Sequence, residues 1–282
     1  MEAIAIKKVL LTGSTGFIGS NLLPLLSEHY DIIAPKRSEL DLYDSGAVRN
    51  YLCKGCFDAV IHFANPTAHN PIDAKRGLLE GSLRVFSSFE HCSDFFGKLI
   101  YLGSGAEYGK HRDITLIKEE SFGDELPKDT YGLSRYIIYR LAEKYENIIN
   151  LRLFGCYGPG DFSHKLIPHV IESIESRKTI ELKQDVWFDY LYVNDILPTL
   201  LHFIEQPAKY TSYNLCSSQP ILISSVAQEV QKQMGSYSNI IFKMDGLNLE
   251  YTGSNERLCA ELPSWKPRPI SEGVREILRK MP

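Results

Sequence analysis

A tyrosine and an arginine stand four positions apart, at Tyr131 and Arg135, in the stretch DTYGLSR. In a helix this spacing places both side chains on one face, close enough for the guanidinium to act on the phenol. A tyrosine ordinarily has a pKa of about 10, so acid–base work near neutral pH needs a positive charge that stabilises the phenolate. The pattern therefore predicts a working pair. The alternative is two residues that only line a helix face.

A serine lies upstream, at Ser104 in the stretch YLGSGAEYG, where an apolar run ends. Such a position falls at the carboxyl edge of the predicted sheet, where open α/β proteins bind ligands. Its hydroxyl could hydrogen-bond a substrate oxygen that Tyr131 protonates. Taken alone, Ser104 is more often a loop-capping hydroxyl and Tyr131 a half-buried core ring, so the interpretation depends on a third motif, a glycine loop.

That loop is TGSTGFIG, residues 12–19, which follows an apolar run and opens a helical pattern. Glycines at this spacing permit a tight turn and close approach of a phosphate, and the helix N-terminus offers unpaired N–H groups and a positive dipole end. The loop predicts a bound dinucleotide; an ordinary glycine turn is the alternative. The residues expected to contact the cofactor here are Gly13, Thr15, Gly16, Phe17, Ile18 and Gly19.

Two cations follow the second predicted strand, at Lys36 and Arg37. NAD-binding proteins usually place an acidic residue there to hold the ribose hydroxyls, whereas two cations suit a 2′-phosphate. The sequence therefore favours NADP(H), with NAD(H) possible. Glu39 lies close by, and a solvated basic turn is the alternative interpretation.

Strand-like and helix-like patterns alternate through the first half of the chain, which predicts right-handed crossovers and a parallel sheet covered on both faces. We expect an α/β fold, with a Rossmann-type doubly wound domain over residues 1–157. The strands are expected at 5–13, 30–35, 57–65, 97–104 and 147–155, and the helices at 16–29, about 72–93 and 130–146.

The alternation becomes less regular beyond residue 158. We expect residues 158–282 to form mainly a small mixed substrate-binding lobe, with a strand near 212–216 that returns to the main sheet. Helices are expected at 169–176 and 194–206, and short strands at 179–183 and 189–193.

Composition excludes several classes of protein. The chain has 282 residues, 44% of them hydrophobic, so it can bury a substantial core. A net charge of −4 and the lack of a Lys/Arg block make nucleic acid an unlikely partner. Neither a leader sequence nor an apolar run of membrane-spanning length is found, so we expect a cytoplasmic protein without a membrane partner. Cys53 and Cys56 form a single CxxC without a second ligand pair, and no metal is predicted.

These motifs together resemble the extended short-chain dehydrogenase/reductase family, in its branch of nucleotide-sugar epimerases, dehydratases and reductases. The resemblance spans nearly the whole chain. It rests on TGSTGFIG, LDL at 40–42, HFAN at 62–65, LGSGAEYG, YGLSR, LRLFGCYGPG at 151–160, FDYLYVND at 188–195 and WKPRPISEGV near the end.

The resemblance implies a role for each matching residue. Tyr131 would be the catalytic acid/base and Ser104 the substrate-binding hydroxyl. The further contacts it implies are Asp41 and Leu42 to the adenine, and Phe63 and Ala64 to the ribose and nicotinamide side of the cofactor. It also implies a homodimer built from two helices of each subunit, one of them the Tyr131 helix.

The chain departs from the family at the cation of the YxxxK motif, where it has Arg135. Lysine there holds the nicotinamide ribose and favours the phenolate; arginine can do both but does not give up its proton. We therefore predict an electrostatic rather than a proton-relay role, a weakened or lost activity being the alternative. Gly105 and Ala106 replace the Asp-Glu pair of the dehydratases, which makes dehydration unlikely. Glu107 is expected to point elsewhere.

Family members that epimerise before reduction use a cysteine and a histidine, and the matching positions here are Ala106 and Lys165. This favours simple ketone reduction. Phe188 stands where the family commonly has an arginine that holds the nucleotide diphosphate. The remaining candidates for that contact are Lys165, Lys183 and Arg257.

The function expected from the sequence is NADPH-dependent reduction of a nucleotide-linked 4-keto-6-deoxy sugar, for surface polysaccharide synthesis. An alternative is a nucleotide-sugar 4-epimerase that retains NAD. Another, from a different class, is a non-catalytic NADP-binding sensor or scaffold. The sequence leaves open the nucleotide base, the keto position, the product stereochemistry and the oligomer.

Overall fold

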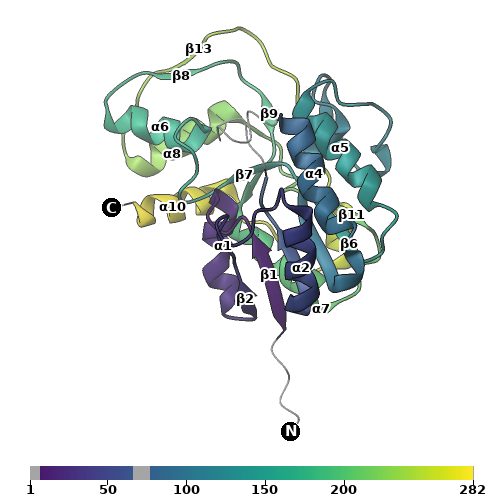
Figure 1. The fold of residues 1–282 in the computed structure, drawn as a ribbon. Coiled ribbons are helices and arrows are strands. Elements are labelled where there is room, and N and C mark those ends of the chain that lie inside the picture. The colour runs from purple at the N-terminus through teal and green to yellow at the C-terminus, as the bar shows by residue number, and fades with distance from the viewer. Residues whose placement is uncertain (1–6, 66–76, 282) are drawn as a thin grey trace.

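A parallel sheet of six strands occupies the centre of the computed structural model, which describes residues 7–65 and 77–281 (Figure 1). The strand order is β2-β1-β3-β4-β6-β11, and each neighbouring pair is parallel. The expected α/β fold with a doubly wound parallel sheet is confirmed. The strands are β1 (Lys8–Thr12), β2 (Asp31–Ile33), β3 (Phe57–His62), β4 (Phe96–Ser104), β6 (Ile148–Leu153) and β11 (Ser212–Leu215).

Helices cover both faces of this sheet, because successive side chains of a strand point to opposite sides. Leu11 of β1 belongs to a core with α1 and α7, whereas Leu10 belongs to a core with α2, α4 and α5. The first face carries α1 (Phe17–Ser27), α7 (Leu197–Glu205) and α9 (Glu256–Glu261). The second carries α2 (Ser45–Gly55), α4 (Leu78–Glu90) and α5 (Thr130–Ala142).

The sheet has a switch point at β1, which pairs with β2 on one side and β3 on the other. In doubly wound folds a ligand crevice lies at the carboxyl ends of the strands at this point. The register pairs Thr12 with His62 across it, and Ser104 ends the next strand along the sheet. The glycine loop after Thr12 and the side chain of Ser104 therefore lie at the same edge of the sheet.

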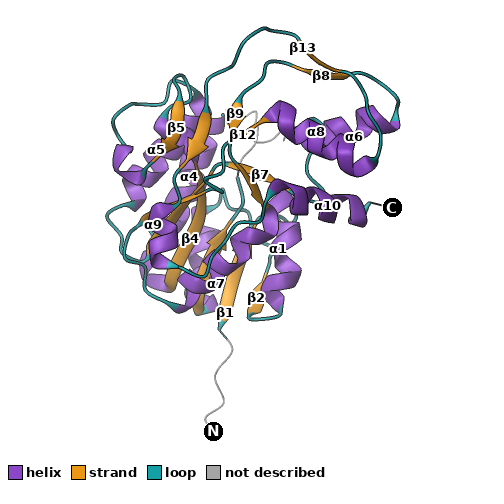
Figure 2. Cartoon of the chain, turned by 180° about the vertical axis from the view of Figure 1, so that it is seen from behind, coloured by secondary structure: helices purple, strands orange, loops and turns teal. Residues whose placement is uncertain are grey.

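A smaller lobe stands beside this edge (Figure 2). Its core lies mainly between α6, α8 and α10, and further short strands connect the lobe to the main sheet. Its helices are α6 (Leu166–Glu175), α8 (Ile223–Met234) and α10 (Ile270–Lys280). The short strands are β5 (Ile114–Ile117), β7 (Gly155–Tyr157), β8 (Ile180–Leu182), β9 (Trp187–Phe188), β10 (Tyr190–Tyr192), β12 (Ile221–Leu222), β13 (Ile240–Phe242) and β14 (Tyr251–Gly253). Four short 3-10 helices are η1 (Ser93–Phe95), η2 (Gly105–Tyr108), η3 (Glu119–Ser121) and η4 (Val193–Ile196).

The second half of the chain contributes to both regions. The strand expected near 212–216 is β11, and it pairs in parallel with β6. Helices α7 and α9 also pack on the main sheet, so residues 158–282 supply more than the lobe. The division of the chain at residue 157 stays a prediction. Of the helix expected over 72–93, α4 begins at Leu78, and residues 72–76 lie outside the described residues.

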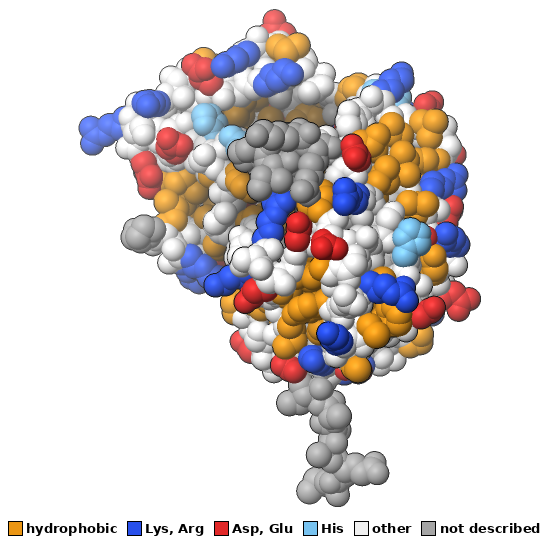
Figure 3. Space-filling view, in the orientation of Figure 1, with side chains coloured by type: hydrophobic (Ala, Val, Ile, Leu, Met, Phe, Trp, Pro, Cys, Tyr) orange, Lys and Arg blue, Asp and Glu red, His pale blue; other side chains and the backbone are white. Residues whose placement is uncertain are grey.

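The surface carries mixed charge. On the face drawn in Figure 3, Lys and Arg side chains are interspersed with Asp and Glu. Within the described ranges, no helix is long and apolar enough to span a bilayer.

Candidate active site

Two glycines of the TGSTGFIG loop are required by close backbone contacts. Gly13 has φ +78°, and a Cβ there would lie 2.4 Å from the Ala64 backbone nitrogen. A Cβ on Gly19 would lie 2.2 Å from the Gly13 carbonyl oxygen. A Cβ on Gly16 would meet only that carbonyl, at 3.4 Å, and Gly16 is the N-cap of α1 without a side-chain hydrogen bond. The helix N-terminus is therefore open to an anionic group, as a pyrophosphate site requires.

A cavity of about 470 Å³ surrounds this loop. Its volume is within the range of cofactor sites. The structure brings together in its walls the twelve residues from the first part of the chain that were expected to contact a dinucleotide. They are Gly13, Thr15, Gly16, Phe17, Ile18, Gly19, Lys36, Arg37, Asp41, Leu42, Phe63 and Ala64.

The basic turn after β2 faces the same cavity. Lys36 and Arg37 both line it, and the backbone N–H of Lys36 donates to the Glu39 carboxylate at 2.7 Å. Glu39 thus stabilises the turn, and it is absent from the cavity wall. The Arg37 guanidinium lies 5.6 Å from the centre of the Tyr43 ring, another wall residue that sequence reasoning missed. Positive charge at this end of the cavity suits a 2′-phosphate.

Helix α5 places Tyr131 and Arg135 in contact. The carboxylate of Asp129 accepts a hydrogen bond from the Gly132 N–H at 2.8 Å and caps the helix, so Tyr131 falls in its first turn. Arg135 follows one turn later and is 5% exposed. Its guanidinium carbon lies 5.4 Å from the centre of the Tyr131 ring. The expected side-by-side arrangement is present, and its catalytic role stays a prediction.

Asn65 holds the arginine, a contact that sequence reasoning missed. Arg135 Nη2 donates to Asn65 Oδ1, and Asn65 lies in the wall of the cavity. Arg135 Nε is buried and has no hydrogen-bond partner within the described residues. It is a donor that a cofactor hydroxyl would satisfy. The signal in the sequence was the position of Asn65 directly after the strand that ends at the switch point.

His62 lies beneath the same site as a neutral imidazole. A hydrogen bond of 2.7 Å joins Thr12 Oγ1 and His62 Nδ1. Burial, together with the positive charge of Arg135, lowers the pKa of His62 to about 3. His62 therefore supplies no positive charge to this site at neutral pH, whereas the Arg135 guanidinium does.

Ser104 caps η2 and also contacts the C-terminal half of the chain. The Ala106 N–H donates to Ser104 Oγ at 3.2 Å, so the loop-capping interpretation of this residue holds. Its side chain also interacts electrostatically with that of Tyr251 in β14. Ser104 is only 6% exposed and ends β4 at the edge shared with the cavity. Its role as a substrate contact stays a prediction.

Glu107 points away from this edge, as expected. It is fully buried and forms an ion pair of 2.6 Å with Arg152 Nε of β6. Its carboxylate also accepts from the Asn150 amide at 3.0 Å and from the Ser104 backbone N–H at 3.0 Å. It is thus a structural carboxylate and is not positioned to eliminate water.

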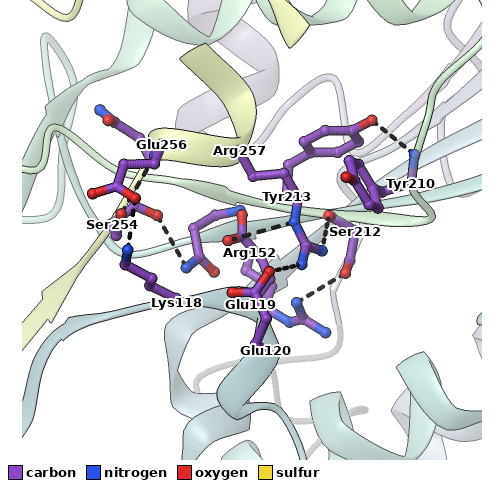
Figure 4. A network of polar contacts seen from close by, with 12 residues as sticks. Lys118, Glu119, Glu120, Arg152, Tyr210, Ser212, Tyr213, Ser254, Glu256 and Arg257 are labelled. Atoms are coloured by element: carbon purple, nitrogen blue, oxygen red, sulfur yellow. Dashed lines mark hydrogen bonds and ion pairs between the residues drawn. The ribbon is translucent and has the colours of Figure 1, made fainter. Parts of the chain in front are cut away.

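The structure does not bring Arg257 to the site. Arg257 Nη2 lies 2.5 Å from Glu120, and its guanidinium covers the Tyr210 ring at 4.4 Å (Figure 4). A second carboxylate, Glu119, lies 3.7 Å from its Nε. These groups engage the cation in a separate network, and the expected substrate contact of Arg257 stays a prediction that this network does not support.

The two candidate lysines lie in different places. Lys165 is exposed at the N-cap of α6, in the loop that contributes Phe162 to the cavity wall. Lys183 is exposed just after β8, in the arm that β8 and β13 form at the outer end of the lobe (Figure 1). Lys165 is thus the better placed of the two.

Over the described ranges, no group of His, Cys, Asp and Glu residues could hold a metal ion. The thiols of Cys53 and Cys56, the CxxC pair, are exposed.

The fold and the cavity define a doubly wound dinucleotide-binding protein. The chain belongs to the NAD dependent epimerase/dehydratase family, which matches residues 9–216.

Similar proteins include nucleotide-sugar enzymes. The GDP-6-deoxy-D-mannose reductase of Pseudomonas aeruginosa is 25% identical over 297 aligned residues, covering 96% of each chain. The CDP-abequose synthase of Salmonella muenchen is 27% identical and covers 96% of this chain and 97% of its own. The structure of the GDP-mannoheptose C4 reductase of Campylobacter jejuni with NADP bound superposes with a TM-score of 0.83. It is 17% identical, covers 97% of this chain and 98% of its own, and shares the fold.

Proposed function

We propose that this protein reduces the ketone of a nucleotide-linked 4-keto-6-deoxy sugar with NADPH. One observation carries the proposal: a dinucleotide-sized cavity with a basic turn adjoins the Tyr131–Arg135 pair, because Arg135 is hydrogen-bonded to Asn65 of the cavity wall. The reductase names of similar proteins support the reaction class, and the NADP-bound relative supports the cofactor. Their GDP and CDP substrates leave the nucleotide base open.

Tyr131 and Ser104 act on the carbonyl oxygen of the substrate, and Arg135 stabilises the negative charge that forms on Tyr131. Bound NADPH supplies the hydride that reduces the ketone carbon. The Tyr131 hydroxyl gives its proton to the carbonyl oxygen as the C=O double bond becomes a single bond, and the Ser104 hydroxyl orients that oxygen. Arg135 stabilises the Tyr131 phenolate that remains until solvent returns a proton. Since arginine keeps its own proton, this role is electrostatic.

The proposal is tested by the loss of reduced-nicotinamide absorbance with a panel of GDP-, CDP- and dTDP-linked 4-keto-6-deoxy sugars. We expect one sugar to be consumed with NADPH faster than with NADH. No consumption, together with NAD that copurifies with the protein, would instead indicate a 4-epimerase. No consumption and no retained cofactor would favour the NADP-binding sensor.

Arg37→Ala is expected to raise the KM for NADPH by about tenfold, because a charge-assisted contact to the 2′-phosphate is lost. The KM for NADH should stay unchanged. Steady-state kinetics with both cofactors measure the ratio, and Lys54→Ala, at the far end of α2, is the control. An equal effect on both cofactors would show that Arg37 contacts something other than the 2′-phosphate.

Asn65→Ala is expected to weaken NADPH binding by about tenfold, because the Arg135 guanidinium loses the hydrogen-bond acceptor that orients it. Fluorescence titration of the cofactor measures the Kd. In an Arg135→Lys background the same change should have little effect, which a double-mutant cycle will show. Asn147→Ala, at a bond to the Ser93 carbonyl, is the control. If the effects of the two substitutions on the binding free energy of NADPH were additive, Asn65 would not act through Arg135.

Two finer features are also proposed, a homodimer and a cytoplasmic location. The resemblance of the Tyr131 helix to the dimer helices of its family supports the first. Light scattering of the purified protein would test it.

A further inference from the structure

The Tyr131 ring lies between two cations, only one of which belongs to the family motif. Arg135 lies 5.4 Å from the ring centre, and Lys110 Nζ lies 5.9 Å from it. Lys110 follows Gly109, whose φ of +82° in the left-handed region turns the chain at the end of η2. We propose that Lys110 is a positioning residue that acts on Tyr131, supplying a second positive charge in the proposed reduction. The expected effect of Lys110 on kcat rests on the proposed function, whereas its effect on the ionisation of Tyr131 does not.

Tyr251 fixes the place of this lysine. Lys110 Nζ lies 5.8 Å from the centre of the Tyr251 ring, so the amine is near both phenol rings. Burial raises the pKa of Tyr251, which keeps this phenol neutral. Lys110 is exposed, and within the described part of the chain its ammonium takes part in no ion pair. Its positive charge therefore acts on the neighbouring Tyr131.

The two cations differ in what they can do. The guanidinium of Arg135 is buried, whereas the ammonium of Lys110 is exposed, so salt screens the charge of Lys110 more strongly than that of Arg135. Among the described residues, the charged and titratable groups near Tyr131 include Arg135 on α5, Asp129 at the helix N-cap, Lys110 after η2 and Tyr251 on β14. Removing the Lys110 charge makes the Tyr131 phenolate less stable, so the phenol ionises at higher pH.

The electrostatic effect can be measured on the full chain without substrate or cofactor. Ring ¹³C NMR of tyrosine-labelled protein follows the ionisation of Tyr131, which Tyr131→Phe identifies by loss of its signal. Lys110→Met is expected to move the midpoint upward by about half a pH unit, less at high salt. Lys110→Arg should leave it in place, and so should the control Lys118→Met, which removes an exposed lysine paired with Glu256. An unmoved midpoint in Lys110→Met would overturn the inference.

The kinetic effect is measured as the pH profile of kcat. At neutral pH we expect Lys110→Met to lower kcat several-fold with an unchanged KM for NADPH, and Lys110→Arg to restore it. The proton donor is the neutral phenol, so the decline of kcat at alkaline pH should shift upward. A rise in the KM for the sugar with an unmoved midpoint would identify a substrate contact instead. If the wild type consumes no NADPH, the proposed reduction fails, while the NMR titration still decides the role of Lys110.

Discussion

Tyr131→Phe is expected to lower kcat for ketone reduction by at least about 10²-fold, the usual contribution of a positioned general acid. The substitution removes only the hydroxyl, so the ring keeps its contacts with Arg135 and Lys110. Without the phenolic proton, the oxygen of the reduced carbon must take its proton from water. The loss should appear in kcat at all substrate concentrations, measured by NADPH absorbance.

The affinity for NADPH should change little in this variant, because the glycine loop and the basic turn are intact. Tyr136→Phe provides a matched control on the same helix, since its hydroxyl accepts a bond from Arg140 and faces another part of the protein. It should retain nearly full activity. If Tyr131→Phe kept more than about a tenth of the wild-type kcat, the phenol would not be the acid.

Glu107→Ala is expected to lower the free energy of unfolding by about 3–5 kcal/mol, because it leaves the Arg152 charge buried without its partner. Both side chains are completely inaccessible to solvent. The substitution also removes the acceptor of the Ser104 N–H, so the start of η2 loses its capping box. Urea unfolding followed by circular dichroism measures the change.

A second substitution separates the unpaired charge from the lost packing. The Arg152 guanidinium lies 4.3 Å from the Tyr139 ring and 4.6 Å from the Phe122 ring, a space that a methionine can partly fill. Adding Arg152→Met to Glu107→Ala should therefore recover part of the stability. Glu256→Ala, at a surface ion pair, should leave the unfolding midpoint close to that of the wild type. No recovery in the double variant would show that the loss does not come from the orphaned charge.

The cofactor cavity could be predicted from the sequence because its determinants are local. The glycine loop and the basic turn belong to consecutive elements of the β1–α1–β2 segment, so the spacing of residue types carries the geometry. The same holds for Tyr131 and Arg135, which one helix brings together.

The remaining contacts depend on segments that are distant along the chain. Arg257 has the charge of a phosphate ligand, but its position is set by Glu120, 137 residues away. Asn65 meets Arg135 across 70 residues, and Lys110 meets Tyr251 only because β14 lies beside η2. Spacing in a single sequence does not reveal which loops converge. The charges could be recognised from the sequence, but their partners could not.

The returning strand β11 has a consequence for synthesis on the ribosome. Strand β6 lies between β4 and β11, and all six of its residues are buried. Until Ser212–Leu215 has been translated, one side of β6 is an open edge that can pair with another nascent chain. Arg152 lies within this edge. A charged side chain that points inward from an edge strand opposes such pairing. We therefore expect Arg152 to disfavour aggregation of the incomplete chain, in addition to its ion pair with Glu107 in the folded protein.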